Sequence, residues 1–198
     1  MKHVRKTKRT VALEDGTKVT VRSIRPEDRD ALRAAFHTLQ PETRYRRFMG
    51  HIADLTPAML TYLTEVDGHD HIALVATLVA PRRARRGAPS ELVAVARVIR
   101  LRSDPKSAEV AVTVTDALQG RGLGSKLLEL LVAAAKERGI ERLVAHDLDG
   151  NSRMKHLLEK TGPLASTTDG VTVTLAQSGS PTALSRLLAW LRPSRRAA

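Results

Sequence analysis

Cysteine is absent from the 198-residue sequence. Its absence excludes disulfide bonds, a thiolate nucleophile and cysteine metal ligands. Aromatic residues make up only 3% of the chain, so we expect a core of Leu, Val, Ala and Ile. No apolar run approaches the roughly 18 residues of a membrane-spanning helix. The basic first ten residues also lack the apolar segment of a secretory signal. We therefore expect a cytoplasmic protein with no transmembrane segment.

Acidic residues are the minority, with 21 Asp and Glu against 33 Lys and Arg and a net charge of +12. Three acid-free segments, residues 1–10, 81–87 and 184–198, hold 13 of the 33 basic residues. The remaining sequence is close to neutral. Such segments attract nucleic acid, anionic membranes or acidic proteins, but charge runs are usually solvated tails and loops. We therefore do not expect nucleic-acid binding.

Apolar periodicity and helix start signals predict a single α/β domain. Alternating apolar residues predict strands at 17–24, 72–79, 91–101, 108–115 and 140–148, with two short strands around Asp169-Gly170. Helices are expected from Pro26, Pro41 and Pro57, over 125–138, and from Asn151 to near Gly162. This order predicts an α/β (α+β) fold, with a mixed, mostly antiparallel twisted sheet of about seven strands and helices on both faces. The expected divisions are a basic arm at 1–16, a domain at 17–176 and a basic amphipathic tail at 177–198.

A glycine-rich stretch, ALQGRGLGSK at residues 117–126, joins a predicted strand to a predicted helix. Its glycine spacing fits neither the dinucleotide motif G-x-G-x-x-G nor the phosphate-binding P-loop. Glycines nevertheless let the backbone approach a ligand. The first N–H groups of the helix, with Arg121 and Lys126, favour an anion. The alternative is a tight turn that binds nothing.

Within this stretch, Gln119-x-x-Gly122-x-Gly124 resembles the signature of the GCN5-related N-acetyltransferase (GNAT) family. The order of elements over 17–176 is similar to that of the same family, and residues 108–162 are the most specific part. The segments QPETRYRRFMG, LTEVDGHDHIALVA, AVARVIR and AEVAVTV resemble a subgroup of bacterial protein lysine acetyltransferases. Some members of that subgroup modify acyl-CoA synthetases. The resemblance implies acetyl-CoA as cosubstrate, no metal, and a protein lysine as the leading acceptor.

The resemblance also implies where acetyl-CoA binds. Its pyrophosphate is expected on the N–H groups from Gln119 to Gly124, and its pantetheine arm along the preceding strand. Asn151 is implied near the pantetheine, and it also suits the N-cap of its helix. The cofactor-binding residues expected are Val112, Thr113, Val114, Gln119, Gly120, Arg121, Gly122, Leu123, Gly124, Ser125 and Asn151.

Amine acetylation needs a base, because a lysine with a pKa near 10.4 is protonated at pH 7. Deprotonation costs about 3.4 pK units, or roughly 4.6 kcal/mol. Glu109 is the only acid in residues 105–115, on the opposite side of its strand from Val110. It also matches the position of the subgroup's proposed base. The alternative is an exposed glutamate paired with Arg97 or Arg100.

A general acid is not evident. Many family members place a tyrosine on the last helix, but here the matching position is Leu158, and the phenylalanine position is Pro163. His146 is a candidate substitute, although a structural or solvent-facing role is the simpler interpretation. His69 and His71 flank Asp70, but a third metal ligand is not evident. Two further hypotheses therefore stay open, a small-molecule amine N-acetyltransferase and a non-catalytic acyl-CoA sensor.

Overall fold

The structure is a computed structural model that describes residues 9–79, 91–146, 151–167 and 170–175. The predicted basic loop at 81–90, the predicted tail at 177–198 and Asp169 lie outside the described residues. Among those that are described, no helix combines the length and the apolarity that crossing a membrane requires.

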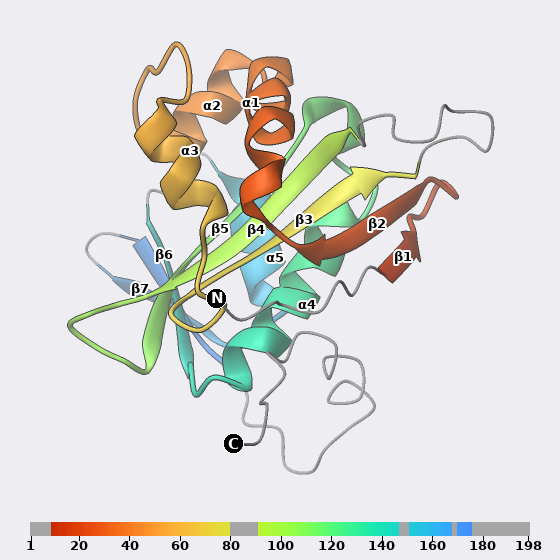
Figure 1. The fold of residues 1–198 in the computed structure, drawn as a ribbon. Coiled ribbons are helices and arrows are strands. Elements are labelled where there is room, and N and C mark those ends of the chain that lie inside the picture. The colour runs from red at the N-terminus through yellow and green to blue at the C-terminus, as the bar shows by residue number, and fades with distance from the viewer. Residues whose placement is uncertain (1–8, 80–90, 147–150, 168–169, 176–198) are drawn as a thin grey trace, which may run out of the picture.

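The described strands form one eight-stranded sheet in the order β1-β2-β3-β4-β5-β6-β8-β7 (Figure 1). All neighbouring pairs are antiparallel except β5 and β6. The predicted mixed, mostly antiparallel sheet is therefore confirmed. The strands are β1 (Arg9–Ala12), β2 (Lys18–Ser23), β3 (His71–Leu78), β4 (Leu92–Arg100), β5 (Ser107–Val114), β6 (Arg142–His146), β7 (Leu164–Thr167) and β8 (Gly170–Thr174).

Strand β1 is the element that sequence periodicity did not predict. It lies inside the segment 1–16 that was expected to be a basic arm, and it pairs with β2 along Arg9–Ala12. Its side chains are mostly exposed, so it carries no clear alternation of buried and exposed residues. Backbone pairing to β2 and the packing of partly buried Val11 against the core hold it in the sheet.

Helices cover both faces of the sheet, as predicted (Figure 1). On one face lie α1 (Arg29–Thr38), α2 (Pro41–Phe48) and α3 (Pro57–Thr64), preceded by a short 3₁₀ turn, η1 (Pro26–Asp28). On the other lie α4 (Leu123–Lys136) and α5 (Ser152–Glu159). Because both faces are covered, seven of the eight residues of β3 are buried.

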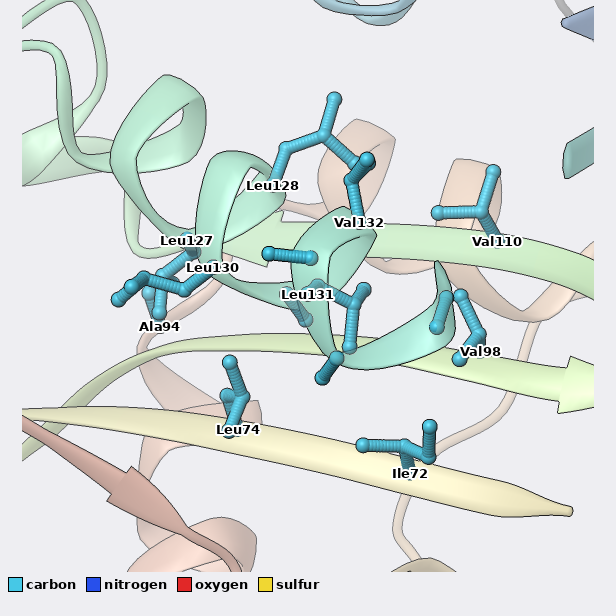
Figure 2. Packing of buried hydrophobic residues seen from close by; sticks show 14 of the residues in the cluster. Ile72, Leu74, Ala94, Val98, Val110, Leu127, Leu128, Leu130, Leu131 and Val132 are labelled. Atoms are coloured by element: carbon cyan, nitrogen blue, oxygen red, sulfur yellow. The ribbon is translucent and has the colours of Figure 1, made fainter. Parts of the chain in front are cut away.

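Two apolar clusters fill the spaces between the sheet and these helices. Figure 2 shows the larger one, in which Leu127 and Leu131 of α4 pack toward Leu74 and Ile72 of β3. Leu127, Leu131 and Leu74 are completely buried. Burial of such leucines contributes about 1.5–3 kcal/mol each, so α4 is held firmly against the sheet.

Strands β5 and β6 separate partway along their length. β5 pairs with β4 from Ala108 to Val114, but with β6 only from Ser107 to Glu109. The parallel pairing follows from the crossover through α4, which returns the chain to the same edge of the sheet. Beyond Glu109 the two strands form an open fork.

Candidate active site

Glu109 lies where the fork opens. It is the last residue of β5 that pairs with β6, opposite Val144, and its side chain is exposed. Its neighbour Val110 is buried against the α4 cluster, so Glu109 projects toward the face that carries α1 to α3. The structure thus places this carboxylate at the junction of two strands, on the side predicted from alternation.

The carboxylate of Glu109 forms no hydrogen bond or ion pair with the described residues. The predicted alternative partners bond elsewhere. Arg97 contacts His71 and the carbonyl of Leu63, while Arg100 donates to Asp70 at 2.7 Å. The guanidinium of Arg47 in α2 interacts electrostatically with Glu109 without a hydrogen bond. Glu109 is therefore accessible to a substrate proton.

The fork leaves one edge of β5 without a strand partner among the described residues beyond Glu109. The N–H of Thr115 bonds the carbonyl of Val93 in β4, so alternation along the strand also turns the peptide groups of Thr113 toward β4. The carbonyl of Val110 and the peptide groups of Val112 face the open edge instead, whereas the N–H of Val110 takes part in the last step of pairing with β6. Val114 faces it too, but its carbonyl accepts a hydrogen bond from the Gln119 side chain at 3.1 Å.

The glycine-rich loop lies at the open end of the fork and leads into α4. Gly120 and Gly122 have φ values of +74° and +80°, a left-handed conformation that favours glycine. Helix α4 begins at Leu123, two residues before the predicted start at 125, because Leu123 is buried in the core. Leu123, Gly124 and Ser125 therefore form the first turn of the helix.

Backbone N–H groups of this loop are available to a ligand. Those of Gly120, Arg121, Gly122, Leu123, Gly124 and Ser125 donate no hydrogen bond to a described residue. The N–H of Gln119 differs, because it bonds the carbonyl of Asp116 at 3.3 Å. Unpaired N–H groups at the start of a 14-residue helix form an anion site.

The side chain of Gln119 holds the loop against β5. Its Nε2 donates to the Val114 carbonyl and to Oδ1 of Asp116, both at 3.1 Å. The other oxygen of Asp116 accepts the N–H of Gln40 at 2.9 Å, just before α2 begins. Asp116 therefore connects the glycine-rich loop to the helices on the opposite face of the sheet.

Three cations surround the loop. Arg121 pairs with Asp15 at 2.6 Å, and Lys126 pairs with Glu129 at 2.9 Å. Arg153, in the first turn of α5, donates from Nη1 to the side-chain oxygen of Gln119. Sequence reasoning missed Arg153. Its only local signal was its place two residues after Asn151, and the contact with Gln119 depends on how α5 packs.

Asn151 caps α5 as predicted, since its side chain accepts the N–H of Met154 at 3.1 Å. Leu158, at the position of the expected tyrosine, is fully buried in the α4 cluster. His146 ends β6 with an exposed side chain. His146 stays the one candidate general acid that the sequence analysis named.

The histidines beside Asp70 have structural partners. His69 Nδ1 lies 2.8 Å from Asp70 Oδ1, and His71 Nε2 lies 3.0 Å from Nη1 of buried Arg97. Within the described ranges, no group of three or more His, Cys, Asp or Glu side chains is arranged to hold a metal ion.

Residues 30–162 match the family model described as the acetyltransferase (GNAT) family. The chain is 32% identical to Acetyltransferase PA5475 of Pseudomonas aeruginosa, over 74% of this chain and 75% of that one. It is 39% identical to Acetyltransferase Pat of Mycolicibacterium smegmatis, over 61% of this chain and 34% of that one, so it spans about a third of Pat. The crystal structure of the GNAT domain of S. lividans PAT matches with a TM-score of 0.73 at 30% identity, covering 85% of this chain and 97% of that one.

Proposed function

Because the chain belongs to the GNAT acetyltransferase family and is therefore an N-acetyltransferase, we propose that it transfers the acetyl group of acetyl-CoA to an amine, with Glu109 as the general base. One observation carries this proposal. The carboxylate of Glu109 and the N–H groups of the glycine-rich loop, which have no hydrogen-bond partner among the described residues, lie at opposite ends of the same strand edge.

The residues along that edge fit acetyl-CoA. The N–H groups from Gly120 to Ser125 suit the pyrophosphate, with Arg121 and Arg153 as supporting cations. The open edge of β5 at the Val110 carbonyl and at Val112 suits the amide groups of pantetheine, which pair with it as a further strand would. Asn151, the N-cap of α5, is the further residue that we propose near the pantetheine. The peptide groups of Thr113 face β4, so we propose that Thr113 contacts acetyl-CoA through its side chain.

When bound, acetyl-CoA supplies a thioester whose carbonyl carbon is open to attack by a neutral amine. Glu109 accepts the proton of the amine, so that the nitrogen lone pair becomes available. The N–C bond forms and the C–S bond breaks. The second proton, which the nitrogen loses as the amide forms, passes through water to the CoA thiolate. Leu158 has no proton to donate, and the low basicity of a thiolate makes a dedicated acid unnecessary.

The acceptor we propose is a lysine ε-amino group of a cytoplasmic protein, with an acyl-CoA synthetase as one candidate partner. The support is the resemblance of segments such as QPETRYRRFMG and AEVAVTV to protein lysine acetyltransferases. A small-molecule amine is the alternative acceptor. Membership of an acetyltransferase family favours turnover over sensing without catalysis.

The direct test replaces Glu109 with glutamine, which keeps the size of the side chain but removes its basicity. We expect Glu109→Gln to lower kcat by about 10²–10⁴-fold and to leave the affinity for acetyl-CoA unchanged. Thiol release from acetyl-CoA, with a panel of Nα-blocked lysine peptides and small amines, measures the first quantity. Isothermal titration calorimetry measures the second.

Glu91→Gln is the matched control, because Glu91 is an exposed glutamate just before β4. It is expected to behave like the wild type in both measurements. Equal turnover by Glu109→Gln and wild type would remove Glu109 as the base. A failure of the wild type to bind acetyl-CoA would remove the proposal as a whole.

A further inference from the structure

A cavity lies on the face of the sheet toward which Glu109 projects, between β4, β5 and the helices α1 to α3. Most of its lining is apolar, including Phe36, Leu55 and Leu63. The guanidinium-bearing side chains of Arg47 and Arg97 also line it. Two cations in an apolar cavity are unusual, because burial of charge costs free energy unless an anion offsets it.

Arg97 is the more deeply placed of the two. It projects from β4 with only 3% of its surface exposed. Nη1 contacts Nε2 of His71 at 3.0 Å, and Nη2 donates to the carbonyl of Leu63 at 3.3 Å. Its Nε is buried and has no hydrogen-bond partner among the described residues. One donor of a buried guanidinium is thus unsatisfied, although nearly all buried polar groups in proteins are paired.

Arg47 of α2 is half-buried, and its guanidinium carbon lies 5.1 Å from the centre of the Phe48 ring. It donates no hydrogen bond to a described residue. Burial lowers the pKa of Arg47, and burial together with the charge of Arg47 lowers the pKa of Arg97 to about 9. An arginine guanidinium stays protonated at pH 7, so the two cations repel each other.

Anionic groups near the pair are too few. Glu109 acts on Arg47, and in the proposed reaction its charge is lost each time it accepts a proton. His71 adds no further positive charge. Burial and the charge of Arg97 lower its pKa to about 4, so it is neutral at pH 7. No described carboxylate acts on Arg97. The cavity therefore has two cations, of which only Arg47 is acted on by a described carboxylate, and an open donor on Arg97.

We propose that this cavity is a carboxylate-binding subsite, in which Arg47 and Arg97 bind a carboxylate carried by one of the two substrates. The proposal rests on the proposed function and names a feature of its substrates. A guanidinium matches the planar geometry of a carboxylate with paired hydrogen bonds. A doubly charged phosphate would have to lose more hydration against the same donors in an apolar cavity.

The position of the cavity connects it to the transfer site. Thr113 of β5 lines it, and Thr113 lies between the residues whose peptide groups face the open fork. Arg47 links it to Glu109. The carboxylate therefore belongs either to the far end of a dicarboxylic acyl group or to the acceptor amine. Both sources fit because the acyl group and the amine react beside Glu109.

Two experimental arms separate these sources. The acyl arm compares the dissociation constants of succinyl-CoA and acetyl-CoA by calorimetry, with no acceptor present. The acceptor arm compares acetylation of Nα-acetyl-lysine with that of its methylamide, in which the carboxylate is masked. We expect the wild type to prefer the carboxylate-bearing member at least tenfold in one arm, as charge-assisted hydrogen bonds imply.

Arg47→Gln is expected to abolish that preference, and Arg97→Lys to reduce it severalfold. Arg46→Gln is the matched control, since Arg46 is the exposed neighbour that pairs with Glu42 in the same helix. It is expected to keep the full preference. Because each arm is a ratio within one variant, altered basicity of Glu109 or partial loss of fold affects both members equally.

The subsite is excluded if the wild type shows no preference in either arm. Equal affinities for the two CoA esters together with no acetylation of either amine count as this result. It is also excluded if Arg47→Gln keeps the wild-type preference. These results are distinct from failure of the proposed function, which would appear as absent binding of acetyl-CoA or as unchanged turnover by Glu109→Gln.

Discussion

Glu109 and Gln119 use their polar side chains in opposite ways. The carboxylate of Glu109 has no hydrogen bond with the described residues, whereas the amide of Gln119 bonds Val114, Asp116 and Arg153. A base must exchange its proton with substrate, so a committed partner would compete with the reaction. A residue that shapes a loop must be fully bonded, because a mobile side chain would leave the loop without a fixed form.

The three loop glycines differ in backbone conformation, and this difference predicts how each tolerates alanine. Gly120 and Gly122 are left-handed, so alanine there costs roughly 1–2 kcal/mol in free energy of unfolding. Gly124 lies in the first helical turn, and an added Cβ would meet Leu157 at 3.4 Å, an ordinary contact. We expect Gly124→Ala to be neutral or stabilising by up to about 1 kcal/mol. Urea unfolding curves measure all three.

Gly139, just after α4, provides a control outside the loop, since its φ of +77° predicts a similar loss with alanine and no change in acetyl-CoA affinity. If Gly124→Ala proves as destabilising as Gly120→Ala, steric crowding rather than backbone conformation governs the loop.

At the scale of elements, the fork depends on where the pairing of β5 and β6 stops. Asp104 holds the closed end, because its carboxylate accepts hydrogen bonds from Ser107 of β5 and Arg142 of β6. Arg142 also donates to the hydroxyl of Ser107 at 3.0 Å. These side chains join the first residues of the two strands, and the fork opens three residues later.

This contact predicts a pH dependence of stability. Hydrogen bonds from Ser107 and Arg142 lower the pKa of Asp104 from its usual 3.8 to about 2. A carboxyl whose pKa is lower in the folded state contributes stability above about pH 4, and this is lost as the pH falls toward 2. We expect Asp104→Asn to be less stable than wild type at pH 6, with the difference shrinking between pH 4 and pH 2. Urea unfolding at several pH values measures it.

Asp54→Asn is the control that distinguishes an effect on the fork from a general loss of stability in acid. Hydrogen bonding to Arg33 lowers the pKa of Asp54 to about 2 as well, but Asp54 lies beside α1, away from β5 and β6. Both variants should therefore show the same trend with pH, whereas only Asp104→Asn should weaken acetyl-CoA binding. Unchanged binding by Asp104→Asn would show that the fork holds its shape without this contact.

At the scale of the whole molecule, the proposed ligand spans three elements. It would contact the open edge of β5, the first turn of α4 and the start of α5. A ligand that binds only the folded state stabilises it, by about 2.7 kcal/mol at 100 times its dissociation constant. For a domain of this size we expect acetyl-CoA to raise Tm by about 5–10 °C.

Differential scanning fluorimetry measures this shift. S-acetylpantetheine at the same concentration is the control, because it carries the thioester and the pantetheine amides but no pyrophosphate. It is expected to raise Tm by less than about 2 °C. Equal shifts from the two compounds would mean that the glycine-rich loop contributes little to binding.

Local patterns in the sequence determined much of this protein. Alternation placed Glu109 on the exposed side of its strand, glycine spacing identified the loop, and Asn151 was recognised as an N-cap. The meander of β3 to β5 and the parallel crossover to β6 followed from element order. Each of these features follows from the order of elements or from residues close together in the chain, because local backbone and side-chain preferences determine them.

Only the tertiary structure decided the rest. The end of β5–β6 pairing, the strand β1, the approach of Arg153 to Gln119 and the burial of Arg97 beside His71 all join segments far apart in sequence. Even the start of α4 moved by two residues, because burial of Leu123 outweighed the local glycine signals. The energies that settle these features come from packing and pairing between distant segments, which no local pattern records.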